Sequence, residues 1–301
     1  MIASATVESH YTEPCMSSPL RIIVLARDSA PHVKKAWEQL APALAGRPGL
    51  EVVAVTTQDD PPTDLPPADL AMVFGGDGAI LRACRHFGDH QIPLLGINMG
   101  RLGFLADLSP EELLLNLEQL ETRSFRITRH LMIECEHFLS DGTLRRYLAL
   151  NEVTISSAAA LEMIDVEFWI DQERATTYSG DGLIISTPVG STAHNLSAGG
   201  PILEQELNAF AVTPICPHTL TNRPLVVSAD HHYTLAVPEA QAGVMLVVDG
   251  QIKEPISLDD RIVVRRAPVT FPLVRVRGHS YYATLRRKLG WGGQPHYQRP
   301  S

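Results

Sequence analysis

One glycine-rich turn carries an acidic side chain among residues suited to binding phosphate. Gly75, Gly76 and Gly78 surround Asp77, between an apolar run from Leu70 and a stretch with helical spacing. Bare N–H groups at a turn that opens a helix attract anions, and the helix dipole adds to this attraction. Because a carboxylate repels phosphate, Asp77 makes chemical sense if it contacts a hydroxyl or a metal ion. A plain strand-to-helix turn with a capping Asp is the alternative that these residues leave open.

Four further stretches hold the small or polar residues that a ligand site needs. Asn151 and Glu152 place an amide beside a carboxylate, and such groups recognise adenine edges, ribose hydroxyls or metals. A glycine-rich loop at 96–105 follows a strand, at the edge where open α/β sheets bind ligands. Small hydroxyl residues and glycines fill 180–201, which suits a nucleotide lying against main chain. Prolines bound a polar segment at 213–225, which is expected to be a rigid loop.

Single residues in these stretches also have structural explanations. Asn151 could end a strand in a turn, Arg223 could form an inter-domain ion pair, and Asp249 could simply start the Asp-Gly turn of a hairpin. His218 is expected to be a hydrogen-bonded histidine of the core. The sequence contains no Walker A, GxGxxG, HExxH or GxSxG motif. A Rossmann dehydrogenase and a P-loop kinase are therefore poorly supported.

The periodicity of apolar residues changes near residue 125 and predicts two domains. Strands alternate with helices before this point, which favours a doubly wound parallel sheet. The strands are expected at 21–26, 50–55, 70–74 and 92–97. The helices are expected at 30–45, at 77–87 and after the capping box of Ser109. Short β runs follow, at 126–136, 147–155, 164–170, 183–186, 232–237, 244–248 and 261–265. The expected class is an α/β N-terminal domain plus an all-β C-terminal domain. The expected boundaries are a disordered leader at 1–19, an α/β domain at 20–124 joined by 275–301, and a β-rich domain at 125–274.

Composition excludes several classes of protein. The chain has 301 residues, 45% of them hydrophobic, and a formal net charge of −9. Its one basic run, Arg286 to Lys288, is too short for a duplex-binding surface, so no nucleic-acid partner is expected. No apolar run is long enough to span a membrane, and the first nineteen residues lack the apolar core of a signal peptide. Cys84 and Cys135 lie in apolar patterns and are expected to be reduced core residues, which fits a cytoplasmic protein.

The order of the motifs resembles the ATP- or polyphosphate-dependent NAD kinases over roughly residues 20 to 293. The matching stretches are GGDG at 75–78, GxNxGxLGFL at 96–105, NE at 151–152, DGLIxSTPxGSTAxxxSxGGP at 181–201, TPICPHTLTNRPLVV at 213–227, DGQ at 249–251 and KLGWGG at 288–293. The GGDG turn is shared with lipid kinases and phosphofructokinases, whereas the long motif at 181–201 narrows the resemblance to NAD kinases.

The resemblance implies an activity and a set of site residues. It implies phosphorylation of the adenosine-ribose 2′-hydroxyl of NAD, which is bound between the two domains, with Asp77 as general base. It also implies Mg²⁺ or another divalent cation, ATP or polyphosphate as donor, and a homo-oligomer, expected to be a tetramer. Gly75, Gly76 and Gly78 match the donor-phosphate turn. The residues matching NAD contacts are Asp77, Gly78, Arg82, Phe104, Asn151, Glu152, Ser179, Asp181, Thr192, Ala193, His194, Asn195, Leu196, Ser197 and Gln251.

Two departures from the family pattern keep alternatives open. Ala79 stands where the family has Thr after GGDG, and His194 stands where it has Tyr. A lipid or small-molecule kinase that shares only GGDG and a non-catalytic NAD(H)-binding sensor are the alternatives. The sequence leaves open whether Asp77 is a base or a metal ligand. Ser179, where some family members carry arginine, predicts a preference for NAD⁺ over NADH.

Overall fold

The computed structural model divides the chain into two compact units. It describes residues 18–27, 30–58, 61–100, 103–106, 108–157, 163–219, 221–239, 243–276 and 281–291. The first unit comprises Met1–Gly76, Leu95–Arg126 and Val274–Ser301, and the second comprises Asp77–Leu94 and Ile127–Leu273. Residues 77–94, which were expected in the first domain, group with the second unit.

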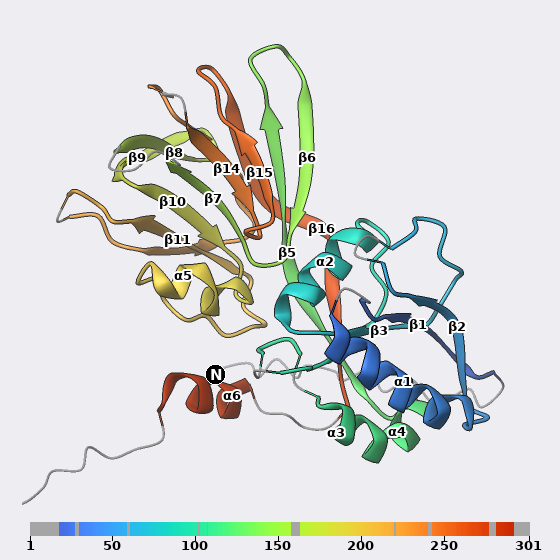
Figure 1. Ribbon diagram of the computed structural model, residues 1–301. Helices are drawn as coiled ribbons and strands as arrows, with labels where there is room; N and C mark the ends of the chain where they lie inside the picture. Colours follow the sequence, from blue (N-terminus) through green and yellow to red (C-terminus); the bar gives the residue numbers. More distant parts are fainter. Residues whose placement is uncertain are drawn as a thin grey trace, which may run out of the picture. The chain divides into compact units, whose positions relative to one another are not determined.

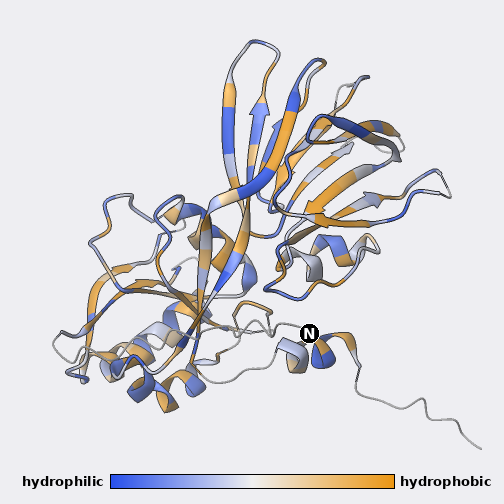
Figure 2. Cartoon of the chain, turned by 180° about the vertical axis from the view of Figure 1, so that it is seen from behind, coloured by the Kyte–Doolittle hydropathy of each residue, from blue (hydrophilic) through white to orange (hydrophobic). Residues whose placement is uncertain are grey.

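The first unit is built on short parallel strands (Figure 1). The strand order is β2-β1-β3-β4, and β1 pairs in parallel with both β2 and β3. The strands are β1 (Leu20–Leu25), β2 (Leu50–Thr56), β3 (Leu70–Phe74) and β4 (Leu94–Ile97), and the helices are α1 (Pro31–Ala45), α3 (Pro110–Leu115), α4 (Leu117–Glu121) and α6 (Tyr281–Leu289). Figure 2 shows these strands mostly in the hydrophobic colour, as expected of parallel strands that helices cover.

Local sequence signals account for the helices of this unit. Helix α1 buries Val33, Leu40 and Leu44, which recur at helical spacing. Helix α3 begins with the predicted capping box: the Glu112 N–H donates to Ser109 Oγ at 3.2 Å, and the Ser109 N–H donates to the Glu112 carboxylate at 2.8 Å. These bonds satisfy N–H groups that the first turn of a helix leaves without partners.

The second unit is rich in antiparallel strands, and its six-stranded sheet has the order β12-β11-β10-β7-β14-β15 (Figure 1). The strands β16, β13, β8 and β9 pair in that order, and β5 pairs with β6. The strands are β5 (Arg126–Phe138), β6 (Leu144–Ala149), β7 (Glu152–Ser157), β8 (Ile164–Ile170), β9 (Glu173–Gly180), β10 (Gly182–Ser186), β11 (Ala209–Ile215), β12 (Leu225–Ser228), β13 (Tyr233–Ala236), β14 (Val244–Val248), β15 (Ile252–Pro255) and β16 (Arg261–Arg275). The helices are α2 (Asp77–Phe87), the 3₁₀ turn η1 (Gly190–Thr192) and α5 (His194–Ser197).

Aromatic side chains fill the core of the second unit. The rings of Phe168 and Tyr233 stack with centroids 5.7 Å apart, and Phe210 meets Tyr233 edge-on at 6.0 Å. All three residues are fully buried. Offset and edge-on ring pairs of this kind stabilise a core beyond the burial of their area.

The expected fold class is confirmed, but several expected elements differ. The continuous strand predicted at 147–155 is two strands, β6 and β7, separated at Leu150 and Asn151. Strand β11 runs to Ile215, so the predicted loop at 213–225 starts later. Strand β16 is longer than 261–265 and passes the predicted boundary at 274. The strands β9, β11, β12 and β15 were not predicted.

Two predictions on single residues have opposite outcomes. Cys84 and Cys135 are buried free thiols, as expected, whereas Cys15 lies outside the described residues. His218 is exposed, so the expectation of a core histidine is wrong.

Among the helices described, none combines the length and the apolar composition that crossing a membrane requires.

Candidate functional site

The glycine-rich turn links β3 to α2. Gly75 has φ 149°, which a side chain would disfavour, and its N–H donates to the Ile97 carbonyl at 2.9 Å. Ideal Cβ atoms at Gly76 and Gly78 would meet no atom within 4 Å. The space above both glycines is therefore open, next to the first turn of an 11-residue helix that starts at Asp77. Such a helix N-terminus with open space in front of it suits a phosphate.

Helix α2 is held by a turn of the antiparallel sheet in its own unit. Arg85 Nη1 donates to Gln251 Oε1 at 2.5 Å. Gln251 Nε2 donates to the Gly78 carbonyl at 3.4 Å. Gln251 follows Asp249 and Gly250, which connect β14 to β15 with positive φ angles of 49° and 67°. One hairpin turn thus contacts both the start and the third turn of α2.

The carboxylate of Asp249 accepts three hydrogen bonds from successive backbone N–H groups. Its Oδ2 accepts from Leu150 at 2.9 Å, and its Oδ1 accepts from Asn151 at 2.7 Å and from Glu152 at 3.1 Å. The Asp249 N–H donates in return to the Glu152 carbonyl at 2.9 Å. Asp249 is half-buried as a residue, but desolvation of its carboxylate raises the pKa, while the three N–H groups and Arg85 act in the opposite direction.

The same segment is fixed from its carbonyl side. Thr187 donates its N–H to the Asn151 carbonyl at 2.8 Å and its hydroxyl to the Leu150 carbonyl at 2.6 Å. A Cβ at Gly190 would lie 2.1 Å from the Asn151 carbonyl oxygen, so only glycine allows this approach. The backbone of Leu150 and Asn151 is therefore bonded on both its donor and its acceptor side.

Glu152 presents a buried oxygen that needs a hydrogen-bond donor. Its Oε2 has no hydrogen-bond partner within the described part of the chain. Burial first, and then the charge of Asp249, raise the pKa of Glu152 to about 8. Asn151, the neighbouring residue, is half-buried. An unsatisfied buried carboxyl oxygen costs free energy that a ligand hydroxyl or amino group would recover.

In the loop after β10, some polar side chains form hydrogen bonds within the loop and others are exposed. The amide of Asn195 is buried: its Nδ2 donates to the carbonyls of Ser191 at 3.1 Å and Pro201 at 2.9 Å, and its Oδ1 accepts from Thr213 at 2.7 Å. Asn195 was expected to contact NAD, but its side chain holds the loop together. The side chains of His194 and Ser197 are exposed, whereas the rest of the predicted set in this loop, Thr192, Ala193 and Leu196, is half-buried.

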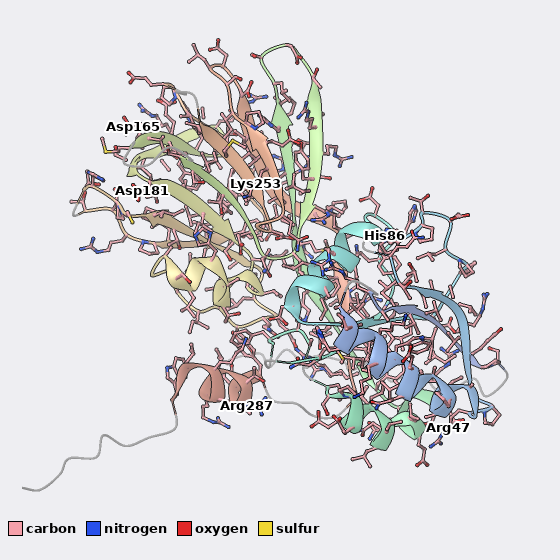
Figure 3. The ribbon with its side chains drawn as sticks, in the orientation of Figure 1. Arg47, His86, Asp165, Asp181, Lys253 and Arg287 are labelled. Carbon is pink, nitrogen blue, oxygen red and sulfur yellow. The ribbon has the colours of Figure 1, made fainter. Side chains whose placement is uncertain are left out.

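Acidic side chains gather where β9 passes into β10. Asp181 is exposed between the two strands, and the Ser179 hydroxyl donates to Asp165 Oδ1. Figure 3 labels Asp165 and Asp181 at the same end of the second unit. A hydrogen bond from the Cys216 thiol to Asp181 raises the pKa of Cys216. Two carboxylates, those of Asp165 and Asp181, therefore lie on the residues that flank the β9–β10 junction or pair with it.

Phe104 belongs to the first unit, where it contacts the C-terminal helix. The ammonium of Lys288 lies 4.2 Å from the centroid of its ring, and the Tyr281 ring is 6.3 Å away. Arg275 Nη2 donates to the Phe104 carbonyl at 3.1 Å. A cation–π contact of this kind helps to fix the orientation of the ring.

The structure brings only part of the predicted site together. Asn151, Glu152 and Gln251 meet through the Asp249 turn, and Gln251 also reaches Gly78. Arg82 lies on α2, four residues after Gly78. Gly75, Gly76 and Phe104 belong to the first unit, and Ser179 and Asp181 lie at the β9–β10 junction.

Sequence reasoning missed Asp249 and Arg85 as members of this group. It assigned Asp249 to a hairpin turn, which is correct but incomplete. The Asp-Gly pair gives the turn, and only the fold shows that the carboxylate bonds a segment 97 to 99 residues away.

The carboxylates fit a metal shared with a phosphorylated ligand rather than a protein cage. Among the described residues, no group of three or more His, Cys, Asp or Glu side chains could hold a metal ion. The Asp249 carboxylate is already used by the backbone, because both of its oxygens accept N–H hydrogen bonds. Magnesium commonly uses only one or two carboxylates together with substrate phosphates, and Asp77 at the glycine-rich turn suits that mode.

Comparison with protein families gives two matches that together span most of the chain. Residues 22–125 match the ATP-NAD kinase N-terminal domain, and residues 150–276 match the ATP-NAD kinase C-terminal domain. A curated NAD kinase of Rhodopirellula baltica is 46% identical over 276 residues, covering 92% of this chain and 88% of that protein. A curated NAD kinase of Geobacter sulfurreducens is 40% identical over 254 residues, covering 84% and 86%.

Solved structures resemble the fold over nearly the whole chain. A yeast NADH kinase complexed with NADH has a TM-score of 0.84 and 22% identity, covering 94% of this chain and 91% of that one. An NAD kinase from Archaeoglobus fulgidus in complex with ATP has a TM-score of 0.72 and 29% identity, covering 91% and 100%.

Proposed function

This chain belongs to the NAD kinase family, whose members phosphorylate NAD to NADP, and on that premise we propose that Asp77 activates the acceptor hydroxyl while Asn151 and Glu152 position it. Phosphoryl transfer depends on positioning and charge stabilisation more than on covalent chemistry. The residues at the glycine-rich turn and at the β6–β7 break are suited to these two tasks.

The observation that carries this proposal is the buried Oε2 of Glu152 without a partner among the described residues. A ribose offers hydroxyl donors that would satisfy this oxygen. With a pKa of about 8, Glu152 exchanges its proton near neutral pH, and in either protonation state it can bond a hydroxyl. Asn151, whose backbone is fixed on both sides, would add an amide for a second contact with the nucleoside.

The donor phosphates are proposed to bind at the start of α2. The open space at Gly76 and Gly78 lets phosphate oxygens approach the backbone N–H groups. Mg²⁺ bound to those phosphates would neutralise charge, and Asp77 is the residue of this turn that would hold it or its water. Asp77 also has the chemistry to accept the proton of the 2′-hydroxyl, and we favour this role.

ATP is the proposed donor. The related Archaeoglobus fulgidus NAD kinase was solved in complex with ATP. Polyphosphate presents the same phosphoanhydride to the turn, so its use is a separate question for the assay. We also propose that the nicotinamide lies near Ser179 and Asp181, where carboxylates would favour a positively charged ring.

A direct assay tests the proposal. Purified protein with Mg²⁺ and ATP is expected to convert NAD into NADP, measured by an NADP-specific dehydrogenase. Parallel reactions replace ATP with polyphosphate, or replace NAD with diacylglycerol or a sphingoid base. Phosphorylation of a lipid would favour the lipid-kinase alternative, whereas NAD binding without NADP formation would favour a sensor.

A further inference from the structure

The turn between β14 and β15 contacts both polar elements of the second unit that the proposed reaction uses. Through Gln251 it contacts Gly78 and Arg85 of α2. Through Asp249 it binds the backbone at Leu150, Asn151 and Glu152. Leu150 and Asn151 lie at the β6–β7 break and Glu152 begins β7, and the backbone N–H groups of all three donate to the Asp249 carboxylate.

We propose that Asp249 is the positioning residue for the Asn151–Glu152 pair, fixing through their backbone the two side chains that receive the nucleoside of NAD. This inference rests on the proposed function, which assigns NAD to those two residues. Asp249 acts through the segment it binds, because both of its oxygens are already occupied by N–H groups.

The charge of Asp249 is part of this role. Three N–H dipoles converge on one carboxylate, and charge-assisted bonds of this kind are stronger than neutral ones. An asparagine at this position would keep one oxygen for Asn151 and Glu152. Its amide nitrogen would then face the Leu150 N–H, and two donors cannot bond each other. The Asp249→Asn variant therefore releases one end of the segment while it preserves shape.

The backbone at Asp249 favours a folded Asp249→Asn variant. Its φ is 49°, in the left-handed region where Asn and Asp are the most tolerated side chains after glycine. Asp259→Asn is a matched control, because Asp259 is an exposed aspartate with φ 69° in the turn before β16. Both variants lose one negative charge at a turn residue with positive φ.

The experiment compares NAD affinity and kinetics in the full-length variants. Asp249→Asn is expected to raise both the Kd and the KM for NAD by about tenfold, with the KM for ATP close to wild type and a melting temperature that is lower but still shows a folded protein. Asp259→Asn is expected to leave all four values unchanged. An unchanged Kd for NAD in a folded Asp249→Asn variant would overturn the inference.

A double-mutant cycle separates this inference from the proposed function. If Asp249 acts through Asn151, Asp249→Asn weakens NAD binding much less in an Asn151→Ala background than in wild type. Equal effects in both backgrounds would overturn the positioning role. If Asn151→Ala alone leaves NAD binding unchanged, the proposed function fails at that residue whatever Asp249 does.

Hydrogen exchange in the wild-type protein provides a test that needs no variant. If Asp249 holds the segment in place before substrate arrives, the amide protons of residues 150–152 are protected in the free enzyme. Exchange as fast as in an open loop, with protection only after NAD is added, would show that the substrate rather than Asp249 orders this segment.

Discussion

The backbone N–H of Glu152 donates to Asp249 Oδ1 at 3.1 Å, so two acidic residues share one small region. Burial, and secondly the charge of Asp249, raise the pKa of the Glu152 carboxyl to about 8. The ordinary pKa of a glutamate side chain, which applies in the unfolded chain, is 4.5. The folded protein therefore keeps a proton on Glu152 at pH values where the unfolded chain has released it.

This relationship predicts how stability depends on pH. The folded state binds the extra proton between pH 4.5 and about 8, so the free energy of unfolding should fall as pH rises through this range. Glu152→Gln removes the titrating group and should flatten this fall. Melting temperatures of both proteins, measured from about pH 5 to about pH 9, check the prediction. Parallel curves for the two proteins would contradict it.

Asp77→Asn is expected to lower kcat by about 10²- to 10⁴-fold while the Kd for NAD stays near the wild-type value. The reason is that the amide cannot accept the proton of the 2′-hydroxyl but keeps the shape of the side chain. Calorimetric NAD binding and steady-state NADP formation measure the two quantities. Turnover near the wild-type rate would remove Asp77 from the mechanism as a base.

Asn151→Ala is expected to raise the KM for NAD more than the KM for ATP, because the proposed contact is with the nucleoside of the acceptor. A lost bond to a buried polar group costs about 1–3 kcal/mol, which is roughly a 5- to 150-fold weaker interaction. Asn208→Ala is the control, since Asn208 is exposed and binds Asp230. Asp181→Ala should show the same selectivity for NAD. A selective rise in the KM for ATP would show that these residues contact the donor ATP and not the acceptor NAD.

Ser179→Arg is expected to shift the preference from NAD⁺ toward NADH. A guanidinium about 6 Å from the cationic ring, at an effective dielectric near 20, repels it by roughly 3 kcal/mol before screening. In the wild-type protein, Asp165 and Asp181 would favour the cationic ring on the proposed placement of the nicotinamide near Ser179. The ratio of kcat/KM for the two substrates should therefore favour NAD⁺ in wild type and fall at least tenfold in the variant at low salt. An unchanged ratio would place the nicotinamide elsewhere.

The homo-oligomer that the family resemblance implies, expected to be a tetramer, would cover an exposed edge of the six-stranded sheet. The edge strand β12 exposes Leu225 and Val226, with relative accessibilities of 40% and 53%. Unprotected apolar edges of this kind are usually covered by self-association. Light scattering should give a multiple of the 33.0-kDa chain mass, and Val226→Lys should reduce it. A monomer mass for wild type at low micromolar concentration would refute the prediction.

Elements defined by local signals could be predicted from sequence. Ser109 and Glu112 lie three residues apart, and their capping box is found where expected. The helix that begins at Asp77 ends at Phe87, as its apolar spacing indicates. These features depend on neighbouring residues, whose interactions are set by the geometry of one or two helical turns.

Elements defined by distant partners could not be predicted in the same way. The run at 147–155 looks like one strand, but Asp249 takes the N–H groups at its centre and breaks it. Strand β9, with the sequence ERATTYSG, is half-exposed and polar, so it lacks an apolar alternation. Asn195 lies in a motif typical of ligand loops, and only its bonds to Ser191, Pro201 and Thr213 show its internal role.

The bond between Asp249 and Asn151 joins residues that are 98 positions apart in the chain. During synthesis, the chain leaves the ribosome from its N-terminus, so Asn151 and Glu152 emerge long before the aspartate that orders them. A nascent chain that ends before Asp249 therefore has the glycine-rich turn, Asn151 and Glu152, but lacks the carboxylate that binds their backbone. On the proposed role of Asp249, binding of the dinucleotide at Asn151 and Glu152 would become possible only late in translation, once the turn at Asp249 has emerged from the exit tunnel.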